Sequence, residues 1–261
     1  MISMLSLGWG IQDSSPVRET GKLSLTETTA SFIYQSFLSG HKILTQEENP
    51  NVQAVNRISG RLIAAVKKYY QRSKMTRELE GFHWECHLIQ EKKEDAWCLP
   101  GGKMAVYSSL LSLTQSDAAL AVVLAHEIAH VLLHHGDARM KSYLRDFLYE
   151  KNLKSALSAK KRETLDFFRM AYGNGDYVGV IRGFNPKDEQ EADELGAIFC
   201  GLAGYHPKEA IVFWERMKSL NATSRQPILI STHPIDPERI PKLRLVMDPI
   251  VRTYYTSSEL K

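Results

Sequence analysis

The sequence predicts an α+β fold that is mainly helical, with one small antiparallel sheet. Apolar residues recur with a helical period in segments on both sides of a short central region. In that region, residues 82–107, apolar and polar residues alternate with the period of two that is typical of strands. No linker or repeat divides the chain. We therefore expect one domain over residues 25–261, after an irregular lead-in at 1–24.

Local signals place each element in order. The apolar stripe that includes Val55, Ile58 and Leu62 predicts an amphipathic helix. Pro100-Gly101-Gly102 predicts a turn between two strands, and Ser116 can cap a helix that ends at Gly136. We expect helices over 24–40, 51–70, 117–135, 187–202, 207–221 and from 236 onward, and strands over 82–89, 96–99 and 104–107. The charge-rich residues 137–186 form a long insert, which we interpret as a possible lid.

Composition excludes several classes of protein. The net charge is +3, from 33 basic and 30 acidic residues, and no stripe of Lys and Arg predicts nucleic-acid binding. Three widely spaced cysteines give neither a disulfide framework nor a cysteine zinc site. No apolar stretch reaches the ~18–20 residues that span a bilayer, and residues 1–10 lack the basic start of a signal peptide. We expect a chain without a transmembrane segment or a signal peptide.

The pattern H-E-x-x-H at His126, Glu127 and His130 lies inside an apolar run. Two histidines four residues apart on a helix face the same way and can share one metal ion. The glutamate between them can hold a water molecule on that ion. This pattern is typical of a zinc metallopeptidase, and a catalytic zinc needs a third protein ligand.

The third ligand has to come from another part of the chain. His134 lies ~12 Å along the helix from His126 at ~1.5 Å per residue, which is too far. The class with a nearby third histidine needs a glycine and a histidine where this chain has Leu133 and Gly136. The remaining class uses a glutamate on a later helix. Glu189 fits, with Asp193 on the same face to accept the N–H of a zinc-bound histidine.

These residues resemble the gluzincin family that includes the CAAX prenyl proteases, the heat-shock protease HtpX, the periplasmic chaperone-protease BepA and the mitochondrial inner-membrane stress proteases. Further stretches agree with the family's motifs: Leu99-Pro100-Gly101-Gly102, Gly204-Tyr205-His206-Pro207, and Ser231-Thr232-His233-Pro234 followed by Arg239-Ile240. The chain departs from the family at Asn185-Pro186, where Ser-Arg is frequent, and it lacks the transmembrane helices of many members.

The resemblance implies a zincin-like metallopeptidase domain with one Zn²⁺ per chain, held by His126, His130 and Glu189. Glu127 would act as general acid–base. His233 would either stabilise the oxyanion or bind the zinc as a fourth, inhibitory ligand, and both roles stay open. Gly102, Met104 and Val106 are the candidate substrate-binding residues, on a strand whose edge would pair with an extended substrate.

The expected function is therefore that of a zinc endopeptidase acting on misfolded or membrane-associated proteins. The alternative is a chaperone-like or binding module with a self-inhibited zinc site. Expected partners are protein or peptide substrates, without nucleic acid and with possible proximity to a membrane; the oligomeric state is left open. The resemblance implies a periplasmic or membrane-associated location, with the cytoplasm as the alternative.

Overall fold

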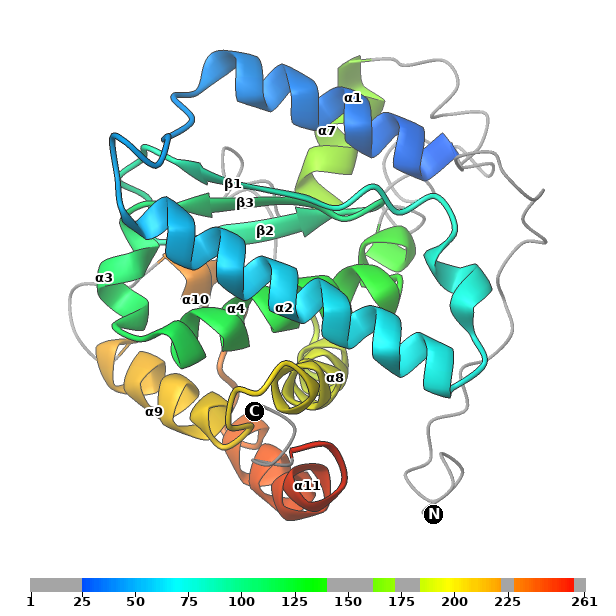
Figure 1. Ribbon diagram of the computed structural model, residues 1–261, viewed down its shortest axis with the longest axis vertical. Coiled ribbons are helices and arrows are strands. Elements are labelled where there is room, and N and C mark those ends of the chain that lie inside the picture. The colour runs from blue at the N-terminus through cyan, green and yellow to red at the C-terminus, as the bar shows by residue number, and fades with distance from the viewer. Residues whose placement is uncertain (1–24, 140–161, 172–183, 222–227, 256–261) are drawn as a thin grey trace.

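A three-stranded sheet lies between two groups of helices in the computed structural model, which describes residues 25–139, 162–171, 184–221 and 228–255 (Figure 1). The strands β1 (Glu85–Ile89), β2 (Ala96–Leu99) and β3 (Lys103–Tyr107) lie in the order β1-β3-β2. β2 and β3 form an antiparallel hairpin. Its turn needs glycine at position 102, where φ is +80° and a Cβ would lie 2.5 Å from the ring of Trp84.

The sheet is mixed, whereas the sequence predicted an antiparallel one. β1 pairs with β3 in parallel, from Glu85 opposite Lys103 to Ile89 opposite Tyr107. The hairpin returns β3 into the space between β1 and β2, so β3 runs in the same direction as β1. Alternation along a strand indicates its two faces but not its partners, which is why the sequence did not reveal the parallel pair.

Helices cover both faces of the sheet. On one face, α1 (Leu25–Gly40) and α7 (Arg162–Ala171) pack against one set of alternate strand residues. The helices contribute Ile33, Tyr34, Phe37 and Phe168 to this cluster, and the strands contribute Trp97, Leu99, Ala105 and Tyr107. On the other face, α2 (Asn51–Arg72) and α4 (Asp117–Leu132) pack on the second set: Leu88, Cys98, Met104 and Val106. Because both faces are covered, the alternation of apolar and polar residues is incomplete.

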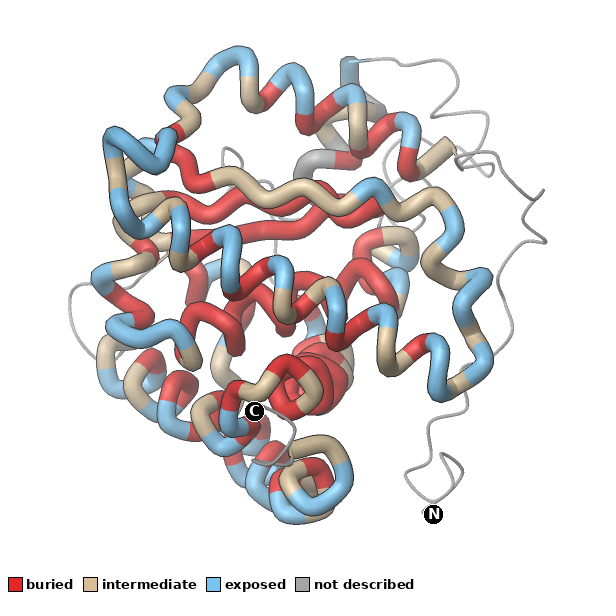
Figure 2. The backbone as a smooth tube through the Cα atoms, in the orientation of Figure 1, coloured by how far each residue is buried: buried red, intermediate tan, exposed pale blue. Residues whose placement is uncertain are grey.

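The helix α4 runs through the interior of the molecule. Every residue from Ala119 to Leu132 is buried, as the continuous red trace of this helix indicates (Figure 2). A helix that is apolar all round is typical of a protein core. α8 (Pro186–Leu202) packs along α4 more extensively than any other pair of elements. A Cβ at Gly196 of α8 would meet the backbone of Ala125 and His126 at 3.1–3.3 Å, so glycine permits this close approach.

Further helices complete the layer around α8. α9 (Glu209–Asn221) packs against α4, and α11 (Arg239–Tyr254) packs against both α8 and α9. The short elements are η2 (Thr76–Leu79), α3 (Leu110–Thr114) and α10 (Ile228–Thr232). Across the described residues, none of these helices combines the length and the apolar character needed to cross a bilayer. The lead-in at 1–24 and most of the insert, 140–161 and 172–183, lie outside the described residues, so the lid stays a prediction.

Candidate metal centre

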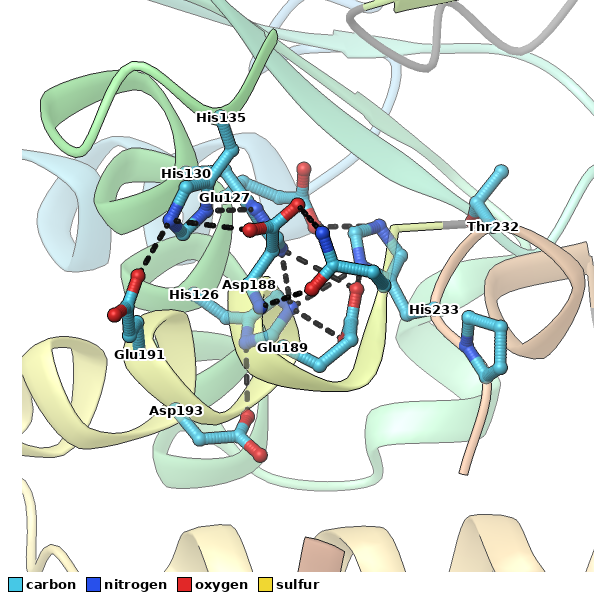
Figure 3. Close-up of polar contacts among 12 residues, drawn as sticks. His126, Glu127, His130, His135, Asp188, Glu189, Glu191, Asp193, Thr232 and His233 are labelled. Carbon is cyan, nitrogen blue, oxygen red and sulfur yellow. Dashed lines mark hydrogen bonds and ion pairs between the residues drawn. The ribbon is translucent and has the colours of Figure 1, made fainter. Parts of the chain in front are cut away.

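The H-E-x-x-H residues lie in the buried middle of α4 (Figure 3). Ser116 begins this helix by accepting the backbone N–H of Ala119. His126, Glu127 and His130 are each at most 4% exposed. Their spacing brings the Nε2 atoms of the two histidines to 3.0 Å from each other. Two imidazole nitrogens therefore face one point in the interior.

Glu189 and His233 complete a cluster of four side chains around that point. Glu189 lies in the first turn of α8, and its carboxylate oxygens are 3.3 Å from Nε2 of His126 and 3.5 Å from Nε2 of His130. His233 follows α10 and carries its Nδ1 to 3.1 Å from Nε2 of His126 and 3.0 Å from Oε1 of Glu189. The structure thus brings together residues that are more than a hundred positions apart.

The geometry of this cluster fits a metal ion. Bonds of ~2.0–2.1 Å place the corners of a tetrahedron about 3.3 Å apart, and the separations described above run from 3.0 to 3.5 Å. The four groups form a set that can hold a metal ion. Oε1 of Glu127 and Oε2 of Glu189 are also buried without a hydrogen bond among the described residues, although each lies within ion-pair distance of a basic group, His233 and Arg239 respectively. Imidazole nitrogen and carboxylate oxygen are ligands that zinc accepts.

His233 also contacts Glu127. Its Nε2 lies 3.1 Å from Oε1 of Glu127, while its Nδ1 faces Glu189. Burial opposes a charged ring, but the carboxylates of Glu127 and Glu189 outweigh it and raise the pKa of His233 to about 10. In the metal-free protein this imidazolium supplies the positive charge between the two carboxylates.

Asp193 supports His126 from the next turn of α8. Its Oδ1 lies 2.8 Å from Nδ1 of His126 and accepts the indole N–H of Trp214 at 2.9 Å. Arg239, at the start of α11, donates to both oxygens of Asp193 at 2.7 and 2.9 Å. The Nη1 atom of Arg239 also lies 2.6 Å from Oε2 of Glu189. One buried guanidinium therefore balances two buried carboxylates.

These contacts set the charges of the cluster. Burial would raise the pKa values of Glu189 and Asp193, but Arg239 and the nearby histidines hold both below their ordinary values. Burial would lower the pKa of His126, yet Glu189 and Asp193 raise it. The pKa of His130 falls well below its ordinary value because of burial and the neighbouring charge on His126. Both carboxylates are therefore ionised at neutral pH.

The end of α4 differs from the sequence prediction, which continued the helix to residue 135. The helix ends at Leu132, and His134 takes a left-handed conformation with φ of +57°. Residues five apart on a continuous helix would point ~140° away from each other. The break instead turns His135 back, and its Nδ1 lies 2.8 Å from Nδ1 of His130. The sequence predicted neither this break nor the contact between His130 and His135.

A further buried carboxyl, Asp95, was not predicted from the sequence. Asp95 precedes β2, is 1% exposed, and its Oδ2 has no hydrogen-bond partner among the described residues. Burial, reinforced by the charge of Glu127, raises the pKa of Asp95 to about 8. Arg239 belongs to one of the stretches that resemble the family's motifs, but the sequence predicted no role for it. Both residues stand next to other charged residues in the sequence, Asp95 after Lys93-Glu94 and Arg239 after Glu238, so no local signal marked either of them as buried.

The prediction that a substrate pairs with the strand at residues 102–106 is wrong. β3 is the central strand and pairs with β1 on one side and β2 on the other. Met104 and Val106 are 0% exposed, and Gly102 lies in the hairpin turn. The backbone of β3 is therefore already paired, and no substrate can add to it as a strand. The outer strands of the sheet are β1 and β2. A bridge between Ile43 and Ile89 covers the end of β1, whereas no described backbone segment pairs with the outer side of β2.

Comparisons with known proteins agree with this site. The model of peptidase family M48 matches residues 57–246, a range that contains the four-residue cluster. A mitochondrial metalloendopeptidase OMA1 of Schizosaccharomyces pombe is 30% identical over 166 residues, which cover 63% of this chain and 47% of that relative. The human metalloendopeptidase OMA1 is 28% identical over 167 residues, covering 62% and 32%.

A bacterial relative aligns over the same share of the chain. The β-barrel assembly-enhancing protease of Escherichia coli K12 is 29% identical over 169 residues, covering 62% of this chain and 34% of that protein. The matched region thus spans less than half the length of each of these relatives. The resemblance deduced from the motifs and the zincin-like, mainly helical fold are both confirmed. Since the family model covers well over half of the sequence, this chain belongs to peptidase family M48.

Proposed function

We propose that this chain is a zinc-dependent endopeptidase, with His126, His130 and Glu189 as zinc ligands. One observation carries the proposal: three potential ligand side chains converge in the interior directly beside Glu127, a buried carboxylate that is not needed to hold a metal. A purely structural site would have no use for that carboxylate. Membership of a peptidase family supports the same reaction.

When bound, zinc would lower the pKa of a coordinated water toward ~7 and polarise the scissile carbonyl. Glu127 would accept the proton of the attacking water and then deliver it to the nitrogen of the leaving amine. Asp193 holds the ring of His126 in a fixed orientation through Nδ1. Arg239 keeps Asp193 and Glu189 ionised, so that both stay available for these roles.

We propose that the substrate pairs with the outer edge of β2, a strand whose residues are each at most 2% exposed here, so that a covering segment has to move before the substrate binds. This strand packs against α4, and its first residues follow Asp95, a group close enough to Glu127 and His233 to interact with their charges. An extended segment that pairs with such an edge is held by its backbone, which gives weak sequence preference. Unfolded or misfolded proteins are therefore the substrate class that we propose.

A second candidate function is a self-inhibited form of the same site. His233 occupies a fourth position, which a catalytic zinc leaves open for water. The segment before it also lies beside the start of β2, because the backbone N–H of Leu229 donates to the carbonyl of Glu94 at 3.3 Å. Residues 228–233 would have to move before a substrate can enter. In this form the chain would bind proteins without cleaving them.

The deciding experiment compares zinc-loaded wild type with Glu127→Gln on unfolded casein. We expect Glu127→Gln to reduce cleavage by about 10²–10⁴-fold, the usual contribution of a general acid–base, while its zinc content stays that of wild type. Glu215→Gln, at a half-exposed glutamate on α9, is the matched control and should cleave normally. Equal cleavage by wild type and Glu127→Gln would contradict the role of Glu127 as general acid–base, and no cleavage by zinc-loaded wild type would leave the binding function.

The cellular setting rests on the relatives. Their names connect one group with mitochondria and another with β-barrel assembly. On this basis we propose that the chain acts close to a membrane, on misfolded or membrane-associated proteins, with the cytoplasm as the alternative. Cell fractionation, together with a comparison of protein levels between cells that carry wild type and Glu127→Gln, would test the location and the substrates separately.

A further inference from the structure

A chain of hydrogen bonds leads from His130 to the surface of α8 (Figure 3). Nδ1 of His130 lies 2.8 Å from Nδ1 of His135, and Nε2 of His135 lies 3.2 Å from Oε2 of Glu191. Asp188 adds a second carboxylate oxygen 4.0 Å from the same Nε2. His130 and His135 are both at most 5% exposed. The contact between the two rings is therefore shielded from water.

The protons along this chain can be ordered in only one way once His130 uses Nε2 to bind a metal. The other nitrogen of His130, Nδ1, then carries a hydrogen and must donate it. The acceptor is the lone pair on Nδ1 of His135. The remaining hydrogen of the neutral His135 ring lies on Nε2, and it is donated to the carboxylate of Glu191. In this order, every nitrogen of the two rings has a partner for its hydrogen or its lone pair.

Different side chains thus orient the two histidines of the H-E-x-x-H pattern. His126 contacts a carboxylate directly, at Asp193. His130 has no carboxylate at its Nδ1 and meets His135 instead. We propose that His135 is a positioning residue for His130, which fixes the orientation of that ring and passes the restraint on to Glu191 on α8. This inference rests on the proposed function, because it requires His130 to be a metal ligand.

Packing on the other side of the ring completes the restraint. The ring of Phe184 stacks on His130 with centroids 3.9 Å apart and an interplanar angle of 22°. Phe184 restricts tilting of the imidazole, whereas His135 restricts its rotation in its own plane. A metal ligand needs both restraints, since a small rotation moves Nε2 away from the metal.

A second metal ion is the competing explanation for this cluster. His135, Asp188 and Glu191 together form a group that can hold a cation. A cation on Nε2 of His135 would, however, leave the hydrogen of that ring on Nδ1. It would then point at the N–H of His130, with two donors 2.8 Å apart. The two sites could not be filled together in this arrangement, so the positioning role is the consistent one.

The test measures zinc affinity of wild type, His135→Leu and His135→Asn by competition with a chromophoric chelator. Leucine fills space without an acceptor, so we expect affinity to fall by about 10–100-fold, the usual effect of removing such a partner. The amide oxygen of asparagine can take the place of Nδ1, so His135→Asn should stay close to wild type. The absorption spectrum of the Co²⁺-substituted protein should change in His135→Leu and be restored in His135→Asn.

The neighbouring histidine provides a matched control. His134 has a positive φ, which asparagine tolerates, and its side chain is 45% exposed. His134→Asn should bind zinc like wild type. Unfolding in the presence of a chelator shows whether each variant is folded, independently of the metal.

Three outcomes would overturn the positioning role: unchanged affinity in His135→Leu, an equal loss in His135→Leu and His135→Asn, or two zinc ions per wild-type chain of which His135→Leu loses one. Failure of the proposed function looks different. In that case the zinc affinities would follow the expected order, but the wild-type protein would not cleave casein.

Discussion

Nε2 of His233 lies 3.1 Å from Oε1 of Glu127. The imidazole thus occupies the place beside the general base where a water molecule would have to stand during hydrolysis. Its other nitrogen, Nδ1, faces the proposed ligands His126 and Glu189. The same side chain therefore blocks both the base and the open metal position in this conformation.

From this contact we predict that His233→Ala increases casein hydrolysis at a fixed zinc concentration. Removal of the ring frees Glu127 and opens the fourth position for water, which a catalytic zinc requires. The measurement is the initial rate of cleavage by zinc-loaded protein, with His83→Ala as a control at an exposed histidine. A reduced rate would instead mean that His233 stabilises the oxyanion.

Much of this site could be predicted from the sequence because its parts obey local spacing rules. His126 and His130 share a helix face, and so do Glu189 and Asp193, because residues four apart lie on one side of any helix, independently of tertiary structure. The helices α4 and α8 were also predicted within a few residues of their observed bounds, because their apolar pattern and caps are local signals.

Features that depend on tertiary pairing could not be predicted in this way. The parallel partner of β1 and the central place of β3 follow from how the hairpin folds back, not from the alternation along each strand. His135 meets His130 only because the helix breaks at His134. Arg239 reaches Asp193 across 46 positions, and nothing local indicates that contact.

We predict that Glu189→Ala removes most of the bound zinc. The variant leaves two histidines, which is one ligand fewer than a catalytic zinc usually has. Elemental analysis after dialysis should give one zinc per chain for wild type and for the control Glu215→Ala, and much less for Glu189→Ala. Stoichiometric zinc in Glu189→Ala would assign the third ligand to another residue.

Zinc removal should also lower stability, since a ligand that binds only the folded state stabilises it. We expect a chelator to reduce the melting temperature of wild type and to have little effect on Glu189→Ala. The measurement is thermal unfolding with and without the chelator. An equal shift in both proteins would mean that the stabilising metal lies elsewhere.

Arg239→Met should be strongly destabilising in metal-free protein. Methionine keeps the length of the side chain but leaves Asp193 and Glu189 buried without their cation. Breaking a buried ion pair by removing one partner costs about 3–5 kcal/mol. Urea unfolding measures this loss as a change in the free energy of unfolding.

The same helix offers a control for this prediction. Arg244 pairs with Glu215 at the surface, where both side chains are about half exposed. An exposed pair contributes roughly 0–1 kcal/mol, so Arg244→Met should have a small effect. A double variant, Arg239→Met with Asp193→Asn, should recover part of the loss because it removes one of the two buried carboxylates that have lost their cation. Equal losses for Arg239→Met and Arg244→Met would contradict a buried charge network.

Asp95→Asn should stabilise the metal-free protein increasingly as the pH rises. The pKa of Asp95 is raised from 3.8 to about 8 by burial and by Glu127. Between these two values the folded state holds a proton that the unfolded state has lost. The free energy of unfolding of wild type therefore falls as pH increases, by at most about 1.4 kcal/mol per pH unit from this group. Asparagine is neutral throughout and lacks this dependence.

The quantity to measure is the difference in unfolding free energy between Asp95→Asn and wild type from pH 5 to 9, in a chelator. A chelator is needed because a nearby cation would lower the pKa of Asp95 and move the window. The difference should grow up to about pH 8 and then become constant. Asp248→Asn is the control, since the pKa of that exposed carboxyl is lowered and its titration lies below this range. A difference that does not change with pH would show that Asp95 is already ionised at pH 5, and that the charges of His233 and Lys93 outweigh its burial.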